Sequence, residues 1–475
     1  MSASIVNLVY LTAAVLFILG IKGLSKPKTA VRGNLLSATG MLVAIVITLL
    51  DNSIVNFEYI IAGVVVGSVV GALMALRVQM TSIPQMVALL NGFGGGASLS
   101  IALAEYYAKT GGMADLAAKL SVNPFGSGAE ATVAVVSIGL TVLIGAVTLT
   151  GSLVAFAKLQ ELMKKDRGLP GGPIGNALLL LIGLGAVIAL CINPANSTLM
   201  IIIVIVALLL GLSLVMPIGG ADMPVVIALL NSYSGIAAAL AGFILGNTVL
   251  IVAGSLVGTS GLILTKIMCV AMNRSLANVL FGKMAEGGEV ASADEVYGGK
   301  VKSSGAEEVA MMLETAKRVV IVPGFGMAMA QAQHAVRELM DVLESRGTEV
   351  EYAIHPVAGR MPGHMNVLLA EAEVPYDKLV EMERINPTFE DTDVAIVIGA
   401  NDVTNPMARE DKGSPIYGMP ILNVDKAKTV IVIKRSLSPG FAGLPNPLFA
   451  MDNTYMVYGD GKKAVIDITA ALDMA

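Results

Sequence analysis

Long apolar runs fill the first 275 or so residues of the chain, and no other feature limits its fold as strongly. A helix crosses a bilayer with about 17–25 such residues, and because lipid offers no hydrogen bonds, only helices or closed barrels can span it. The sequence therefore predicts a polytopic α-helical membrane domain of about nine helices. We expect them near 4–21, 35–50, 59–76, 83–104, 131–157, 174–192, 199–218, 223–245 and 248–272.

Composition supports a membrane protein and excludes several other classes. A mean hydropathy of +0.76 with only 14% charged residues means that much apolar surface faces lipid. The net charge of −5 argues against a nucleic acid partner. Cys191 and Cys269 lie far apart inside apolar runs, so we expect neither a disulfide framework nor a metal site. Residues 1–20 lack a basic start and a cleavage signal, which predicts a retained first span.

Basic residues between the spans predict the orientation. The loops after the first, third, fifth and ninth spans contain most of them, whereas the alternate loops contain only Lys109 and Lys119. Under the positive-inside rule the N-terminus is then outside and the C-terminal domain is cytoplasmic. The basic residues in question are Lys22, Lys26, Lys28, Arg32, Arg77, Lys158, Lys164, Lys165, Arg167 and Arg274.

An internal repeat relates the fourth and eighth spans. Residues 83–93 match residues 223–233 in a proline, an alanine, a leucine pair, an asparagine and an aromatic residue. Asn91 and Asn231 would then lie at matching depth, about 10–12 Å along helices that rise about 1.5 Å per residue. Each could bind a neighbouring helix or line a polar passage for an ion or proton. Asp222 precedes the eighth span, either as a plain helix cap or as a carboxylate at the mouth of that passage.

Residues 309–475 predict a Rossmann-like α/β domain. Short β-type runs at 318–322, 349–354, 394–398, 429–434 and 454–458 alternate with helical patterns, which is typical of a doubly wound sheet. We expect a membrane domain over 1–275 and a flexible linker over 276–308, since residues 282–308 are rich in Gly, Ser, Glu and Lys without hydrophobic periodicity.

The first strand of this domain leads into a glycine turn, Gly324-Phe325-Gly326-Met327-Ala328-Met329. Such glycines let a backbone approach a pyrophosphate, and the following helix would add its positive N-terminus. Met329 replaces the usual third glycine, which loosens the dinucleotide-binding motif. Two loops after later strands, 355–366 and 399–406, are also dense in functional residue types, and ligands bind at strand ends in such sheets.

The strand ends predict which dinucleotide is bound. The second strand ends in His355-Pro356 and not in the acidic residue that would bind the ribose of NAD. Lys434, Arg435 and Ser436 close the fourth strand, and two cations with a hydroxyl suit a 2′-phosphate. The pocket therefore favours NADP(H) over NAD(H). A solvated strand end is the alternative reading of the two cations.

Together these segments closely resemble the β subunit of proton-translocating NAD(P)⁺ transhydrogenase over essentially the whole chain. The resemblance implies that the soluble domain binds NADP(H), in an orientation reversed from usual Rossmann domains. It implies a separate α subunit that binds NAD(H), a dimer of αβ units, a bacterial inner membrane and direct hydride transfer. Such transfer needs no catalytic acid, base or metal. The matching segments are 219–224, 324–333, 355–374, 399–406 and 434–443.

The resemblance also assigns roles to single residues. Asp222 and Asn231 match positions tied to coupling, Asn91 replaces a membrane histidine of many relatives, and Asp402 with the lid 436–443 would form the cofactor-side switch. Phe441 stands where some relatives have tyrosine. The expected cofactor-binding residues are Gly324, Phe325, Gly326, Met327, Ala328, Val357, Ala358, Gly359, Arg360, Met361, Pro362, Gly399, Ala400, Asn401, Asp402, Lys434, Arg435, Ser436, Gly440, Phe441, Ala442 and Gly443.

Two other functions fit parts of the pattern. A transporter gated by NADP(H) without any redox step would need the same glycine and basic motifs. A membrane anchor would explain the apolar half, but the polar repeat argues against it. Reduction of an NADP analogue by NADH separates an enzyme from both.

Overall fold

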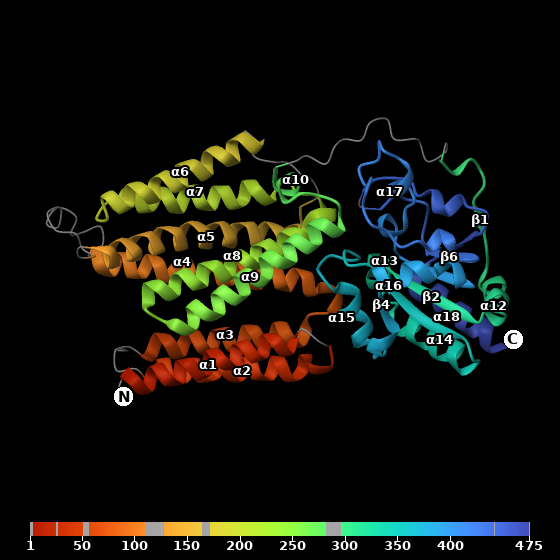
Figure 1. Ribbon diagram of the computed structural model, residues 1–475, viewed down its shortest axis with the longest axis horizontal. Helices are drawn as coiled ribbons and strands as arrows, with labels where there is room; N and C mark the ends of the chain where they lie inside the picture. The colour runs from red at the N-terminus through yellow and green to blue at the C-terminus, as the bar shows by residue number, and fades with distance from the viewer. Residues whose placement is uncertain are drawn as a thin grey trace. The chain divides into compact units, whose positions relative to one another are not determined.

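The computed structural model in Figure 1 describes residues 3–24, 27–50, 57–110, 125, 128–163, 172–281, 296–440 and 442–474. Contacts divide the chain into two compact units. One comprises Met1–Gln79, Gln85–Pro217 and Val226–Ile263, and the other comprises Met80–Pro84, Ile218–Val225 and Leu264–Ala475.

The N-terminal part of the described chain contains nine helices that are long and apolar enough to cross a membrane. This confirms the predicted number. The second helix begins earlier than the expected residue 35, because a proline at its first position starts it well before the apolar run. The nine are α1 (Ala3–Leu24), α2 (Pro27–Leu49), α3 (Phe57–Arg77), α4 (Ile83–Thr110), α5 (Ala129–Leu159), α6 (Gly172–Ile192), α7 (Ser197–Val215), α8 (Met223–Leu245) and α9 (Thr248–Ala271).

Small residues bring the membrane helices together. A Cβ added to Gly23 of α1 would lie 2.8 Å from the Cα of Gly33 on α2. Likewise, a Cβ on Gly235 of α8 would lie 2.9 Å from the carbonyl oxygen of Gly254 on α9. Only glycine permits such approach, which is how helices associate where lipid supplies no hydrophobic drive. By contrast, α3 has no buried residue, so its apolar side chains are available to lipid.

The two copies of the repeat share local structure. A 3₁₀ turn precedes each helix: η1 (Met80–Ser82) before α4 and η3 (Gly220–Asp222) before α8. Pro84 and Pro224 are the second residues of their helices, where the missing N–H costs no helical hydrogen bond. The sequence match therefore corresponds to equivalent helix starts.

A seven-stranded parallel sheet forms the C-terminal domain, in the order β1-β7-β6-β5-β2-β3-β4. The five predicted strands are confirmed, while β1 and β4 were not predicted because two or three residues show no pattern. The strand order reverses between β2 and β5, and ligands of such sheets bind at this reversal. The strands are β1 (Lys302–Ser303), β2 (Arg318–Pro323), β3 (Glu349–Ile354), β4 (Leu379–Glu381), β5 (Val394–Ile398), β6 (Thr429–Lys434) and β7 (Thr454–Tyr458).

Both faces of the sheet are covered, which explains why its central strands are apolar throughout. Val319 and Ile321 of β2 belong to one buried cluster, and Val320 and Val322 belong to the other. The first face packs against α12 (Ala306–Glu314), α14 (Gln333–Ser345), α15 (His364–Glu371) and α18 (Gly461–Met474), of which α14 and α18 run side by side in Figure 1. The second face packs against α16 (Met382–Ile385), α17 (Met407–Glu410), η5 (Asn386–Asp391), η7 (Val424–Lys426) and η8 (Pro447–Ala450).

Part of the segment expected to be a linker belongs to this domain. Lys302 and Ser303 pair with β7, and Tyr297 is buried in the second cluster. The helix α10 (Leu276–Phe281) follows α9, and residues 282–295 lie outside the described residues. The sheet thus extends into residues 296–308, whereas the domain boundaries at 275 and 308 stay a prediction.

Candidate functional site

Two glycine turns meet where the strand order reverses. Gly324 follows β2, and its N–H donates to the carbonyl of Ile398 at the end of β5 (2.9 Å). The N–H of Gly326 donates to the carbonyl of Gly399 (2.8 Å), and a Cβ on Gly326 would lie 2.6 Å from the Cα of Gly399. Because these N–H groups bind the neighbouring turn, the glycines contribute close approach of the two turns and not the exposed donors that the sequence suggested.

The helix after the first turn, α13 (Phe325–Met329), has only five residues. Its Met327 and Ala328 are fully buried in the core, so they support the turn from behind. Phe325 lies under the guanidinium of Arg360, 4.3 Å from the ring centroid, a cation–π distance. A short α13 gives less of the helix dipole than the sequence pattern implied.

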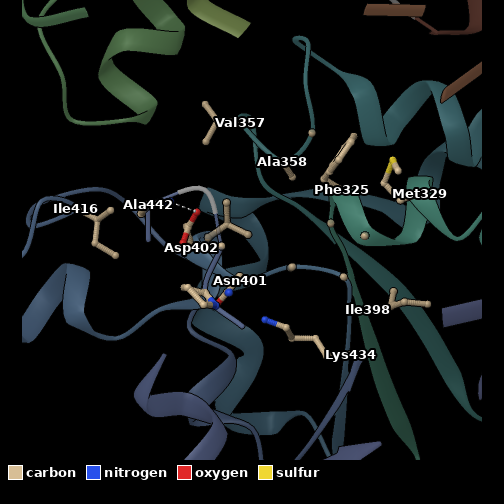
Figure 2. Close-up of a pocket in the computed structure, with 18 of the residues that line it drawn as sticks. Phe325, Met329, Val357, Ala358, Ile398, Asn401, Asp402, Ile416, Lys434 and Ala442 are labelled. Carbon is tan, nitrogen blue, oxygen red and sulfur yellow. Dashed lines mark hydrogen bonds between the residues drawn. The ribbon is translucent and has the colours of Figure 1, made fainter. Parts of the chain in front are cut away.

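A cavity of about 830 Å³ opens beside these turns, and Figure 2 labels ten of the residues that line it. Its size is that of a cofactor site. From the expected cofactor residues the lining contains Gly324, Phe325, Gly326, Val357, Ala358, Gly359, Gly399, Ala400, Asn401, Asp402, Lys434, Arg435, Ser436, Gly440 and Ala442.

Six of the expected cofactor residues do not line the cavity within the described part of the chain, and a seventh cannot be placed. Met327 and Ala328 are core residues, and Arg360 stacks on Phe325. Phe441 lies outside the described residues. The lining does not include the remaining three, Met361, Pro362 and Gly443. The role of the whole set in cofactor binding stays a prediction.

The cavity wall also includes residues that the sequence reasoning missed. Ile416 and Met419 come from the irregular chain between α17 and β6, which has no recognisable pattern. Gly459 and Gly461 follow β7 as a Gly-x-Gly pair, like Gly324 and Gly326 after β2. The same strand-then-glycine argument applied to the last strand would have found this pair.

Lys434 is one of the two cations that are expected to bind the 2′-phosphate. Its ammonium donates to the carbonyl of Ser438 (2.6 Å) and lies 5.0 Å from the ring centroid of Phe449. Burial lowers the pKa of Lys434 below its ordinary value, and the Asp402 carboxylate opposes that shift. Arg435 instead pairs with Asp460 at 3.0 Å, and both side chains are exposed. Lys434 is thus the half-buried charge of the two, and Arg435 is exposed to solvent.

Asp402, which begins η6 (Asp402–Thr404), contacts the segment 436–443 that is expected to be the lid. Its Oδ2 accepts the N–H of Ala442 at 3.1 Å, the contact drawn as a dashed line in Figure 2. A Cβ on Gly440 would lie 2.7 Å from Oδ1 of the same carboxylate. Glycine at position 440 therefore lets the lid approach the carboxylate.

Two buried histidines shape the loop after β3. Nε2 of His355 lies 2.8 Å from the carbonyl of Pro420, and Nδ1 accepts the N–H of Val357 (3.2 Å), which requires the neutral Nε2–H tautomer. Nδ1 of His364 accepts the N–H of Arg360 (3.0 Å). Burial lowers the pKa of both histidines to about 4. They act as neutral hydrogen-bonding groups in the folded domain.

In the membrane part, Asn91 is buried and its Nδ2 donates to the carbonyl of Ile227 on α8 (3.3 Å). Ile227 precedes the half-buried Asn231 by one helical turn. This contact fits interhelical packing as well as a polar passage. The repeat therefore brings Asn91 to the helix that carries its counterpart.

The buried Asp222 forms an ion pair with the partly buried Arg274. One guanidinium nitrogen lies 2.8 Å and 3.1 Å from the two carboxylate oxygens. From the sequence, Arg274 marks only the orientation, because 52 residues separate it from Asp222. Such a pair is costly to break on one side, since the remaining charge stays buried.

A bundle of apolar helices joined to a doubly wound sheet, with a cavity at the reversal of strand order, defines a multi-pass membrane protein with a nucleotide-binding domain. Comparison of its sequence with known proteins identifies the family. Residues 6–471 match the NAD(P) transhydrogenase beta subunit family, and the chain belongs to this family. It is also 47% identical over 478 residues to the NAD(P) transhydrogenase subunit beta of Rhodospirillum rubrum, with both chains covered completely. The same protein from a named strain of that species aligns with the same identity and coverage.

These comparisons confirm the family that the sequence resembled. The chain is a component of an oxidoreductase, and the transporter without redox activity is not favoured. Membership in a transhydrogenase family involves a nicotinamide nucleotide, and a beta subunit implies an alpha subunit.

Proposed function

We propose that the cavity at the carboxyl ends of β2 and β5 binds NADP(H). The observation that carries this proposal is the half-buried Lys434 in the wall of a cavity formed by two glycine turns at the reversal of strand order. The residues fit the cofactor: the turns leave no side chain between them, and the cavity volume of about 830 Å³ suits a ligand of this size. Lys434 and Ser436 would hold the 2′-phosphate, and the lid 436–443 would cover the bound molecule.

We further propose that the chain works with an alpha subunit that binds NAD(H), in a dimer of αβ units. When bound, NADP(H) supplies the hydride chemistry, and the protein supplies position and electrostatics. Asp402 would adjust binding through its contact with the lid at Ala442. No residue of this chain needs to act as a nucleophile or as a general acid or base.

The membrane helices would couple this reaction to proton movement. Asp222, Asn231 and Asn91 are the proposed polar route, in which asparagine orients water and the carboxylate carries the proton. One proton crossing 100 mV provides about 2.3 kcal/mol, which shifts a redox ratio roughly 40-fold. The protein must then alternate between NADP(H)-occluded and open states.

We assign the protein to a bacterial inner membrane, with the N-terminus outside and the nucleotide domain in the cytoplasm. The distribution of Lys and Arg between the spans supports this orientation. The proposed boundaries are 1–275 for the membrane domain, 276–308 for the linker and 309–475 for the nucleotide domain.

Reconstituted vesicles test the proposal. The chain, together with an NAD(H)-binding alpha subunit, should reduce an NADP analogue with NADH and move protons across the vesicle membrane during the reaction. Reduction without proton movement would remove the coupling part. A nucleotide-gated ion flux without any reduction would instead support the transporter.

A further inference from the structure

A tyrosine ahead of the sheet contacts two residues that in turn contact the lining of the cavity. Tyr297 lies between α10 and β1, in the stretch that leads from the membrane helices into the nucleotide domain. It is buried, with 7% of its surface exposed, in the cluster on the second face of the sheet. Nothing in the sequence pattern marks it, because it falls in the segment that resembles a linker.

The phenol oxygen of Tyr297 binds a residue just beyond the lid. It accepts the backbone N–H of Asn446 at 3.2 Å. The fully buried Asn446 donates from Nδ2 to the carbonyl of Asn401 (3.0 Å), next to Asp402. Asn446 follows the lid 436–443 by three residues. Tyr297 therefore fixes the point where the lid rejoins the core.

The ring of Tyr297 is connected to Lys434 through the ring of Phe449. It stacks on Phe449 with centroids 6.4 Å apart and planes at 23°. The ammonium of Lys434 lies 5.0 Å from the centroid of the same Phe449 ring. Phe449 is fully buried, so its ring has little freedom to move without Tyr297 or Lys434 moving too.

We infer that Tyr297 is a positioning residue of the nucleotide site. Its hydroxyl holds the lid through Asn446, and its ring holds Lys434 through Phe449. This inference rests on the proposed binding of NADP(H). It predicts two separable effects, one on the rate at which the lid releases the cofactor and one on the recognition of the 2′-phosphate.

The first effect is tested with Tyr297→Phe in the full chain assembled with its alpha subunit. The ring remains but the acceptor for the Asn446 N–H is lost. We expect NADP⁺ to dissociate about threefold to tenfold faster, the effect of one lost hydrogen bond, with its preference over NAD⁺ retained. Tyr352→Phe is the matched control. Tyr352 is equally buried and loses a hydrogen bond to the Val336 carbonyl (3.3 Å), but it packs on the opposite face of the sheet.

The second effect is tested with Tyr297→Leu, which removes the ring. Titration of the purified full chain with NADP⁺ and NAD⁺ should show the preference for NADP⁺ reduced about threefold to tenfold. The same substitution in the Lys434→Ala background should change the preference less than twofold, because Tyr297 acts through Lys434. An unspecific loss of core packing would not depend on the residue at position 434.

The outcomes separate this inference from the proposed function. If the unsubstituted chain binds NADP⁺ no more tightly than NAD⁺, the proposed function itself fails. If it prefers NADP⁺ but Tyr297→Phe leaves the dissociation rate at the parent value, or Tyr352→Phe accelerates it equally, Tyr297 does not position the lid. If Tyr297→Leu changes the cofactor preference equally with Lys434 and with Lys434→Ala, Tyr297 does not act through Lys434. This double-mutant comparison needs only folded protein with measurable affinity.

Discussion

Oδ2 of Asp402 accepts the backbone N–H of Ala442 at 3.1 Å, across 40 residues of sequence. The contact joins the loop after β5 to the lid after β6, two segments that flank the proposed cofactor cavity. A charged acceptor makes this hydrogen bond stronger than a neutral one would be. The same carboxylate lines the proposed site of an anionic cofactor, so its charge would hold the lid and oppose the ligand.

Asp402→Asn should therefore affect NADP(H) release more than docking. The amide keeps an acceptor for Ala442 but removes the negative charge, which at about 4 Å in water is worth about 1 kcal/mol. We expect release to slow about fivefold and to lose its pH dependence. Stopped-flow release rates measured across pH check this, with Asp377→Asn in the exposed turn η4 (Tyr376–Lys378) as the control. Identical, pH-independent rates in both the variant and the parent would contradict the assignment.

The soluble fragment from about 290 to 475 should fold alone and prefer NADP(H) to NAD(H). Removing both Lys434 and Arg435 should weaken NADP(H) binding by about 2–4 kcal/mol, since each charged hydrogen bond contributes about 1.5–3 and the effects overlap. Lys434→Ala should account for most of it, because Arg435 is exposed and paired with Asp460. Calorimetry with both cofactors measures the difference. Equal affinity of the unsubstituted fragment for NADP(H) and NAD(H) would contradict the assignment.

Asp222→Asn should abolish coupled proton uptake in reconstituted vesicles. It leaves the partly buried Arg274 charge without its partner; breaking a fully buried pair costs about 3–5 kcal/mol, which is an upper bound here. Cofactor binding to the isolated soluble domain should not change. Asn91→Leu should impair uptake less if water can reroute around it, and it serves as the comparison on the neighbouring helix. Normal uptake with Asp222→Asn would remove this residue from the proton route.

The nucleotide domain should lose stability as the pH falls from about 6.5 to about 4. The pKa of His355 is near 4 in the folded state, below its ordinary value of 6.5, so the unfolded chain binds the proton first. The contribution of the neutral histidine to the free energy of unfolding is then fully present above about pH 6.5. Below that pH it falls by about 1.4 kcal/mol per pH unit for each such histidine. Urea unfolding of the fragment at several pH values measures the slope. His355→Gln should make the free energy of unfolding less dependent on pH. The same slope in variant and parent would mean that other groups cause the pH dependence.

Local pattern was enough to predict the main elements of this protein. A span needs only length and hydropathy, and the central strands needed only short apolar runs between turns, so nine helices and five strands could be located in advance. The glycine turns and Lys434 could be placed at one edge because parallel strands end together. β1 and β4 were not predicted, because strands of two or three residues show no hydrophobic periodicity.

The contacts that position the site follow from the tertiary structure alone. Arg274 is 52 residues from Asp222, and Tyr297 is 149 residues from Asn446, so no local pattern relates either pair. Met327 and Ala328 are predicted as turn residues, but they belong to the buried cluster on the first face of the sheet, while Met329 of the same helix is exposed. Hydropathy and turn chemistry act between neighbours in the chain and fix the elements. Ion pairs, stacking and the burial of one hydroxyl depend on which elements meet, and that was decided only when the whole chain packed.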